Sequence, residues 1–203
     1  NPLGPWKKYE GNPVLDLGEK GEWDHGKTRR HTACAAVMKE SAYDIKSGDA
    51  TYYMWYWSAG RIGLATAKHP LGPWKRHEGN PIMTWKEDGG VYPGSVTKIG
   101  DTFYMFVQSP VSVEDQGPFC IATAPKPEGP WTKYEGNPVM TPGDWGSWDD
   151  GGFSEAAARY HEGIFHCVYG GTKAPKVESL GYAWSFDAIN WHKYQANPVV
   201  PIS

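Results

Sequence analysis

Two carboxylate residues stand in settings that suggest acid–base chemistry. Glu155 lies in the segment 153–158, where its neighbours are small or apolar. A carboxylate at the end of a buried strand is costly unless it is paired or used, and a positioned carboxylic acid can protonate a leaving group. Asp24 precedes the one basic cluster of the chain, which contains Lys27, Arg29, Arg30 and His31. We therefore predict a catalytic pair, with Glu155 as the general acid and Asp24 as the opposing carboxylate.

The basic cluster and several aromatic residues are the predicted substrate contacts. Aromatic residues make up 14% of the chain, with 11 Trp and 12 Tyr. A pyranose ring presents C–H groups to an aromatic face, while its hydroxyls need polar partners. Aromatic residues that recur at the same place in each repeat are expected to pack between repeats, so those that do not recur are the better platform candidates. The predicted pocket residues are Arg29, Arg30, His31, Trp57, Tyr92 and Tyr169.

The elements that position these residues follow from a recurring Asn-Pro phrase. Copies stand at 11–15, 79–83, 136–140 and 196–200, and each follows a run containing Trp, a basic residue and an aromatic or His. A period of roughly 60 residues indicates a repeat architecture. Between the copies we expect four short strands per repeat, rich in β-branched and aromatic residues and separated by Gly, Pro, Asn and Asp.

Units of four antiparallel strands at this period are typical of propeller blades. The sequence thus predicts a single all-β domain, a β-propeller over 1–203. Full blades are expected at 31–84, 92–141 and 153–201, with 1–15 as the end of an upstream blade. This is about three and a half blades, and a propeller needs at least about four to close. We therefore expect upstream blades, or a second copy in a homo-oligomer, to complete the ring.

The predicted innermost strands place one acid at a distinctive level. Aligning these strands on Val37, Val96 and Ala158 puts Glu155 opposite Cys34 and Pro93 in the other blades. The structural alternative for Glu155 is an acid bonded to backbone amides or to an Arg. For Asp24 the alternative is a turn-forming Asp, because Asp also follows Trp at Trp148.

Composition excludes several other classes of function. The net charge of −3 gives no basic footprint for nucleic acid. No apolar run reaches transmembrane length, so no membrane partner is expected. The chain begins without a charged-then-apolar leader, which leaves secreted, periplasmic and cytoplasmic locations open.

The sequence resembles the five-bladed propeller glycosidases, the group that contains glycoside hydrolase families 43, 32, 117 and 130. The resemblance rests on the segments 102–106, 62–67 and 71–74 and on the Asn-Pro endings, and it covers essentially the whole chain. It implies a five-bladed-type propeller in which one acid on the first blade is base or nucleophile. A Glu that opens a later inner strand is then the general acid, and Glu155 matches it in its Ser-Glu-Ala context. Asp24 is a looser match to the first acid, and the third acid of the group has no counterpart in the second blade.

Three functions remain open from the sequence. The first is a glycoside hydrolase that cleaves an oligo- or polysaccharide by paired-carboxylate chemistry in the propeller funnel. The second is a propeller that binds glycan or protein without chemistry. The third is a phosphorylase, which would need a basic phosphate site such as Arg29, Arg30 and His31. A carbohydrate is the expected ligand; no cofactor and no catalytic metal are predicted, although the central channel of such a fold has room for a structural divalent cation.

Overall fold

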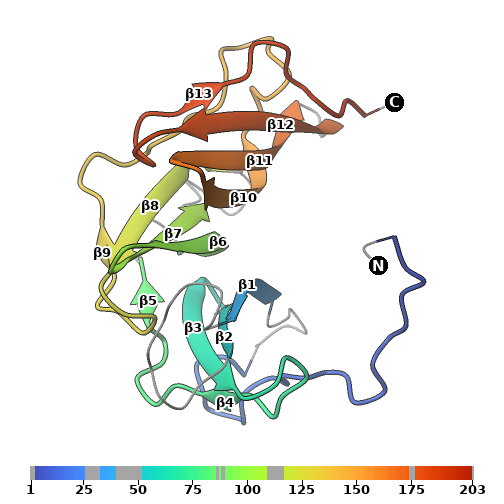
Figure 1. Cartoon of the computed structure of the whole chain (residues 1–203), viewed down its shortest axis with the longest axis vertical. Coiled ribbons are helices and arrows are strands. Elements are labelled where there is room, and N and C mark those ends of the chain that lie inside the picture. The colour runs from blue at the N-terminus through green and yellow to red at the C-terminus, as the bar shows by residue number, and fades with distance from the viewer. Residues whose placement is uncertain are drawn as a thin grey trace.

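The computed structural model describes residues 3–25, 33–39, 52–85, 87, 90–108, 117–173 and 177–202, without the side chains of 33–35 and 177. It is built from β-strands arranged in three antiparallel sheets, which we call the first, second and third blade (Figure 1). The all-β propeller-blade architecture predicted from the repeats is confirmed. Among the described residues, no helix is both long and apolar enough to span a bilayer.

Each blade is a meander that runs from an inner to an outer strand. The first contains β1 (Ala33–Lys39), β2 (Tyr52–Ser58), β3 (Arg61–Ala67), β4 (Lys75–Arg76) and β5 (Met83–Thr84). The second contains β6 (Tyr92–Ile99), β7 (Thr102–Gln108), β8 (Phe119–Ala124) and β9 (Thr132–Lys133). The third contains β10 (Phe153–His161), β11 (Ile164–Lys173), β12 (Val177–Ser185) and β13 (His192–Lys193).

The blades follow one another around an arc, with β6 between β1 and β10 (Figure 1). Two apolar clusters fill the spaces between neighbouring blades and hold them together. Between the first and second blades, Trp55 packs against Phe103, and its indole N–H donates to the carbonyl oxygen of Pro127 at 3.1 Å. Between the second and third blades, Phe106 packs against Phe165 and Trp191. Burial of these rings in the interfaces fixes the angle at which the inner strands meet.

The recurring Asn-Pro phrase has a structural role that is the same in each blade. The side chain of Asn137 accepts the backbone N–H of Ile121 at 2.9 Å and donates to its carbonyl at 2.9 Å. Asn80 clasps Leu64 in this way, and Asn197 clasps Tyr182. This Asn clasp satisfies the backbone of the third strand where the two-residue outer strand ends. The phrase therefore completes the backbone hydrogen bonding at the outer edge of each blade.

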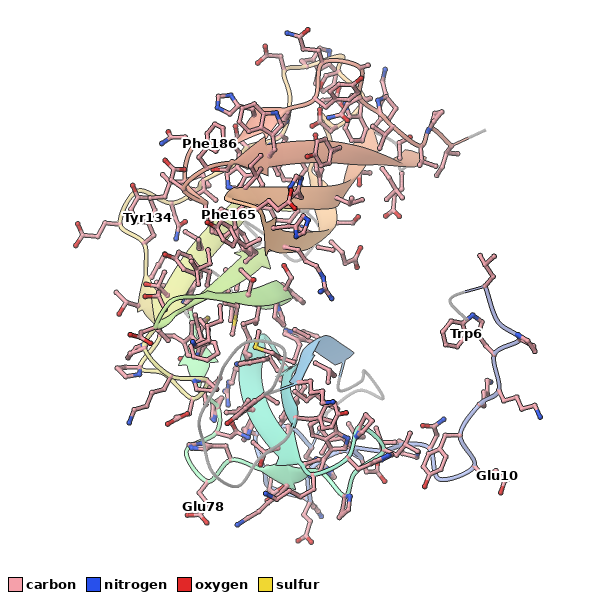
Figure 2. All side chains as sticks on the ribbon, in the orientation of Figure 1. Trp6, Glu10, Glu78, Tyr134, Phe165 and Phe186 are labelled. Carbon is pink, nitrogen blue, oxygen red and sulfur yellow. The ribbon has the colours of Figure 1, made fainter. Side chains whose placement is uncertain are left out.

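The N-terminal copy of the phrase is not in this arrangement. Residues 3–13 form an arm without strands, and Figure 2 shows Trp6 on this arm. Val14 and Leu15 pack against the first blade, and the carbonyl oxygen of Asp16 accepts a hydrogen bond from Arg76. Trp6 is 80% exposed, whereas the equivalent Trp74 is 9% exposed. The prediction that 1–15 is the edge of an upstream blade stays a prediction, because nothing in the described chain pairs with this arm as a strand.

The copy of the phrase that forms a clasp, at Asn137, and the N-terminal copy that does not, at Asn12, allow a matched mutational test. Replacing Asn137 by Ala removes both bonds of the clasp and leaves the N–H and C=O of Ile121 unpaired, so unfolding free energy should fall by about 1–3 kcal/mol. Replacing Asn12 by Ala should change it by less than about 0.5 kcal/mol, because the Asn12 side chain makes no clasp in the described chain. Urea denaturation followed by Trp fluorescence measures both. Equal losses for the two variants would show that the clasp contributes nothing specific.

Candidate functional site

The three inner strands share a bulge near the end that opens the blade. The register with the second strand slips between Cys34 and Ala36 in β1, between Pro93 and Ser95 in β6, and between Phe153 and Ala156 in β10. A bulge bends a strand and re-aims a side chain, and bulges are common beside active sites. The candidate site therefore lies at the level of these bulges.

The bulges of β6 and β10 lie directly against each other. A side chain at Gly94 would place its Cβ 2.6 Å from the carbonyl oxygen of Ala156, so only glycine allows this approach. The backbone N–H of Ala158 donates to the Ser95 hydroxyl at 2.9 Å, and the amide of Gln108 donates to the carbonyl of Phe153. These bonds fix the backbone on either side of Glu155.

The strand register agrees with the sequence alignment of the inner strands at the three residues on which they were aligned, but not at Glu155. Val37 pairs with Met54, Val96 with Met105, and Ala158 with Cys167. Those three partners in turn pair with Ala65, Ala122 and Ala183 at matching places. Two residues further along each second strand, Cys34 pairs with Tyr56 and Pro93 with Val107, but Ala156 pairs with Tyr169. Glu155 therefore lies one residue beyond the predicted level, inside the bulge of β10.

Glu155 opens into a cavity of about 560 Å³ on the third blade. The walls come from β10, β11, β12, the C-terminal segment and Gly94 of β6, and they include Tyr169, Glu178, Leu180 and Val200. In the part of the chain that the structure describes, the Glu155 side chain is exposed and makes no hydrogen bond or ion pair. The expectation of a costly buried acid is therefore wrong: Glu155 is instead a free carboxylate facing a cavity with an apolar floor.

Trp57 and Tyr92 are brought together beside the bulge of β6. Their rings stack with centroids 4.8 Å apart and an interplanar angle of 24°. Tyr92 is 36% exposed, and the buried indole N–H of Trp57 has no hydrogen-bond partner among the described residues. Two of the predicted pocket residues therefore form one aromatic surface with an unused donor.

Tyr169 lines the cavity but is only 1% exposed. Its ring packs against Phe153 and Trp148, and its hydroxyl accepts a hydrogen bond from Asn197 at 3.3 Å. Burial, followed by the charge of Asp149, raises the pKa of Tyr169 above its ordinary value. The Tyr169 ring is therefore part of the packed core, and almost none of its surface is accessible to a sugar.

The structure corrects the grouping of Tyr169 with the aromatic residues that do not recur. Tyr169 pairs with Gly181, as Tyr56 pairs with Gly63, and each tyrosine lies beside the Trp that precedes its blade, Trp148 or Trp23. The two tyrosines are thus equivalent positions in the first and third blades. Their shared environment explains why both are tightly packed.

Asp24 is buried in a cluster that we call the first latch. Its Oδ2 accepts from Arg76 Nε at 2.8 Å and from the hydroxyl of Tyr56 at 3.1 Å, and the residue is 1% exposed. Burial and the neighbouring Asp24 raise the pKa of Tyr56 above its usual range. Asp24 does not line the cavity that contains Glu155. These contacts favour the structural alternative for Asp24.

The third blade repeats this cluster as a second latch. Asp149 Oδ2 accepts from Lys193 Nζ at 2.7 Å, and Asp149 lies beside Tyr169. In the second blade the equivalent cation, Lys133, instead lies over the Trp85 ring at 4.7 Å. Recurrence of the Asp–Tyr–cation arrangement on two blades is what a framework role predicts, because a catalytic residue is needed once.

Three of the predicted substrate contacts belong to the basic cluster that follows Asp24. Arg29, Arg30 and His31 lie outside the described residues. One acid on the cavity wall, Glu178, was not singled out from the sequence; it lies on β12, which has 9 residues against 7 in β3 and 6 in β8. Within the described ranges, no group of three or more His, Cys, Asp or Glu is arranged to hold a metal ion.

Comparison with known proteins identifies the fold. No protein-family model and no curated protein matches the chain. Among solved structures, Zg3597, a family 117 glycoside hydrolase of the marine bacterium Zobellia galactanivorans, is 21% identical with a TM-score of 0.60, over 74% of this chain and 53% of that one. A thermostable family 43 glycoside hydrolase is 21% identical with a TM-score of 0.54, over 75% of this chain and 53% of that one.

A third similar structure is the fructan 1-exohydrolase IIa of Cichorium intybus in complex with 1-kestose. It is 19% identical with a TM-score of 0.56, over 71% of this chain and 29% of that one. The chain spans about half the length of the family 117 and family 43 enzymes and less than a third of the length of the fructan exohydrolase. The resemblance seen in the sequence is confirmed at the level of fold, and this chain has the β-propeller architecture of these glycoside hydrolases.

Proposed function

We propose that the protein is a glycoside hydrolase that cleaves a glycosidic bond in an oligo- or polysaccharide, with Glu155 as the general acid. The observation that supports this most directly is the free carboxylate of Glu155 at the inner-strand bulge, facing a cavity of about 560 Å³. A cavity of this size accommodates one or two sugar rings. The fold it shares with family 117 and family 43 enzymes supports the same reaction class.

The chemistry requires the acid to reach the glycosidic oxygen. Glu155 protonates this oxygen as the bond to the anomeric carbon breaks, so that the departing sugar leaves as an alcohol. Leu180 and Val200 provide an apolar floor against which the C–H face of a sugar packs. The stacked Trp57 and Tyr92 are not part of this cavity, and the Trp57 indole N–H is buried, so a second aromatic contact would come from the exposed part of Tyr92.

Asp24 fits less well as the second carboxylate of this reaction. It would have to leave Arg76 and Tyr56 to meet a sugar or a water molecule. Removing one partner from a buried ion pair is strongly unfavourable. The proposed mechanism therefore places Asp24 in the framework and needs another carboxylate or an external group opposite Glu155.

A substrate panel tests the proposal and separates the alternatives. The protein is incubated with 4-nitrophenyl glycosides of common pyranoses and furanoses and with plant and algal oligosaccharides, with and without inorganic phosphate. We expect release of reducing sugar in the absence of phosphate. Turnover that depends on phosphate and yields sugar 1-phosphate would replace the proposal with a phosphorylase. Saturable binding of a glycan in calorimetry, without any product, would replace it with a binding module.

A further inference from the structure

The third blade has an exposed aromatic cluster where its third strand ends beside its outer strand. Trp184 of β12 pairs with His192 of β13, and Phe186 directly follows β12 (Figure 2). The Trp184 and His192 rings stack with centroids 4.3 Å apart, and the Phe186 ring meets the indole at 5.1 Å and 74°. Phe186 is 66% exposed, and His192 is also exposed. We call these three residues the aromatic corner.

The other two blades have no aromatic residue at the corresponding positions. The pairs equivalent to Trp184 and His192 are Thr66 with Lys75 in the first blade and Thr123 with Thr132 in the second. The residue that directly follows the third strand is Lys68 or Pro125 in place of Phe186. The same pairing of strands therefore forms with small or charged residues, so the blade does not need aromatic rings here.

This corner of a blade stays accessible when another blade packs against the same face. The second blade covers this face of the first blade, and the third covers that of the second. The equivalent outer pairs are nevertheless half-buried or exposed: Thr66 with Lys75, and Thr123 with Thr132. On the inner strands of the same rows, Met38 and Thr97 are only 2% and 3% exposed. Access to the aromatic corner therefore does not depend on how the ring is completed.

The ring nitrogens of the aromatic corner are not used by the fold. The Trp that precedes each outer strand donates its indole N–H to a carbonyl oxygen of the preceding loop at 2.9–3.3 Å: Trp74, Trp131 and Trp191. Neither the indole N–H of Trp184 nor the imidazole of His192 makes a hydrogen bond to the described part of the chain. Aromatic rings with available N–H groups suit a ligand that has both C–H faces and hydroxyls.

The size of the aromatic corner favours a glycan over a protein partner. A stable protein interface buries about 800 Å² on each side and involves about 20–30 residues. Three side chains that already pack against one another provide only a small part of that area, but they match one or two sugar rings. The exposed face of Phe186 can contact the C–H groups of a pyranose, while Trp184 and His192 donate to its hydroxyls.

We propose that the aromatic corner is a second carbohydrate-binding site, which holds a pyranose polysaccharide outside the cavity that contains Glu155. The inference rests on the carbohydrate ligand of the proposed function, but not on hydrolysis. Leu180 on the cavity wall and Trp184 are four residues apart on one face of β12, which is about 13 Å along a strand. A chain of several sugars can contact both places, and binding at one raises the local concentration of the chain at the other.

Native electrophoresis through gels that contain xylan, galactan, galactomannan or laminarin tests this site, with the furanose polymer inulin for contrast. Glu155→Gln serves as the parent, so that the polysaccharide is not consumed. Adding Trp184→Thr and Phe186→Lys introduces the residues of the first blade, and the dissociation constant for the retarding pyranose polymer should rise about tenfold or more. Trp145→Thr is the matched control, because Trp145 is 93% exposed and stacks on no ring of the described chain; its dissociation constant should stay within about twofold of the parent.

The outcomes separate this site from the proposed hydrolase. A protein that is retarded through the aromatic corner but hydrolyses nothing supports the site and removes the hydrolase, whereas hydrolysis of aryl glycosides without retardation by any pyranose polymer overturns the site alone. Equal binding by the parent and the double variant, or equal losses in the double variant and Trp145→Thr, also overturns it. So does a dimer in sedimentation that the double variant abolishes, because the corner is then a protein interface. If the double variant melts at a lower temperature, His192→Thr, which introduces the residue of the second blade, carries the same expectation.

Discussion

Glu155→Gln is expected to lower the turnover of natural oligosaccharides by roughly 10²–10⁴-fold, the usual contribution of a general acid. The amide keeps the size of the side chain but cannot give a proton to the departing sugar. Aryl glycosides with acidic phenol leaving groups need little protonation, so their hydrolysis should be reduced much less. Steady-state kinetics on one natural substrate and one 2,4-dinitrophenyl glycoside measure the difference.

This selectivity distinguishes a general acid from a structural residue. The Glu155 side chain is exposed and unpaired among the described residues, so the substitution should leave the melting temperature and the affinity for sugar nearly unchanged. Glu162→Gln, on the turn that follows β10, should match wild type in both assays. Unchanged turnover of natural oligosaccharides in Glu155→Gln would remove Glu155 from the mechanism, whereas unfolding would show that it supports the blade.

Removal of the second latch should have the largest effect on stability. Asp149→Ala leaves the Lys193 ammonium without its carboxylate and opens a space beside Tyr169. Loss of one member of a buried pair costs about 3–5 kcal/mol, but the Lys193 side chain is 30% exposed and can recruit water, so about 2–3 kcal/mol is expected. For a domain of this size that corresponds to a melting temperature lower by ~5–10 °C, measured by calorimetry.

Asp144→Ala is the control for this experiment. Asp144 is exposed five residues before the latch, and its replacement should alter unfolding by less than about 0.5 kcal/mol. Asp24→Asn extends the comparison to the first latch. If Asp24 belongs to the framework, this variant loses stability but keeps the kcat of its folded fraction. A stable Asp24→Asn protein with kcat lowered at least 100-fold would restore Asp24 as a catalytic carboxylate.

The repeats made the blades and the pairing of Val37, Val96 and Ala158 predictable. The copies of the phrase mark where each blade ends, and the strands before it recur in the same order, so these three residues could be aligned. The pattern contains this information because it is local and recurs. Glu155 was placed one residue away from its true level because the bulge of β10 contains two residues rather than one. Burial of Glu155 was inferred wrongly, because exposure depends on which strands cover the outer face of the blade.

The latches could not be read from local patterns. Asp24 meets Arg76 across 52 residues and Asp149 meets Lys193 across 44, and only the folded sheet brings these pairs together. The equivalence of Tyr56 and Tyr169 is obscured in the sequence because the second blade has Val107 at the corresponding place. Partner glycines opposite them, Gly63 and Gly181, carry the correct register.

The common bulge also bears on how such a protein changes over evolutionary time. The bulge has a similar place in each inner strand but contains Gly94 in β6 and Ser154 with Glu155 in β10, while the pairs that follow it remain in register. At Gly94 the neighbouring blade excludes any side chain, whereas Glu155 faces a cavity and is exposed. The residue type is therefore constrained where two blades touch and is nearly independent of blade stability where the bulge faces open space. A lineage can gain or lose an acid at such an open bulge by a single substitution, so new specificities can be sampled without first rebuilding the scaffold.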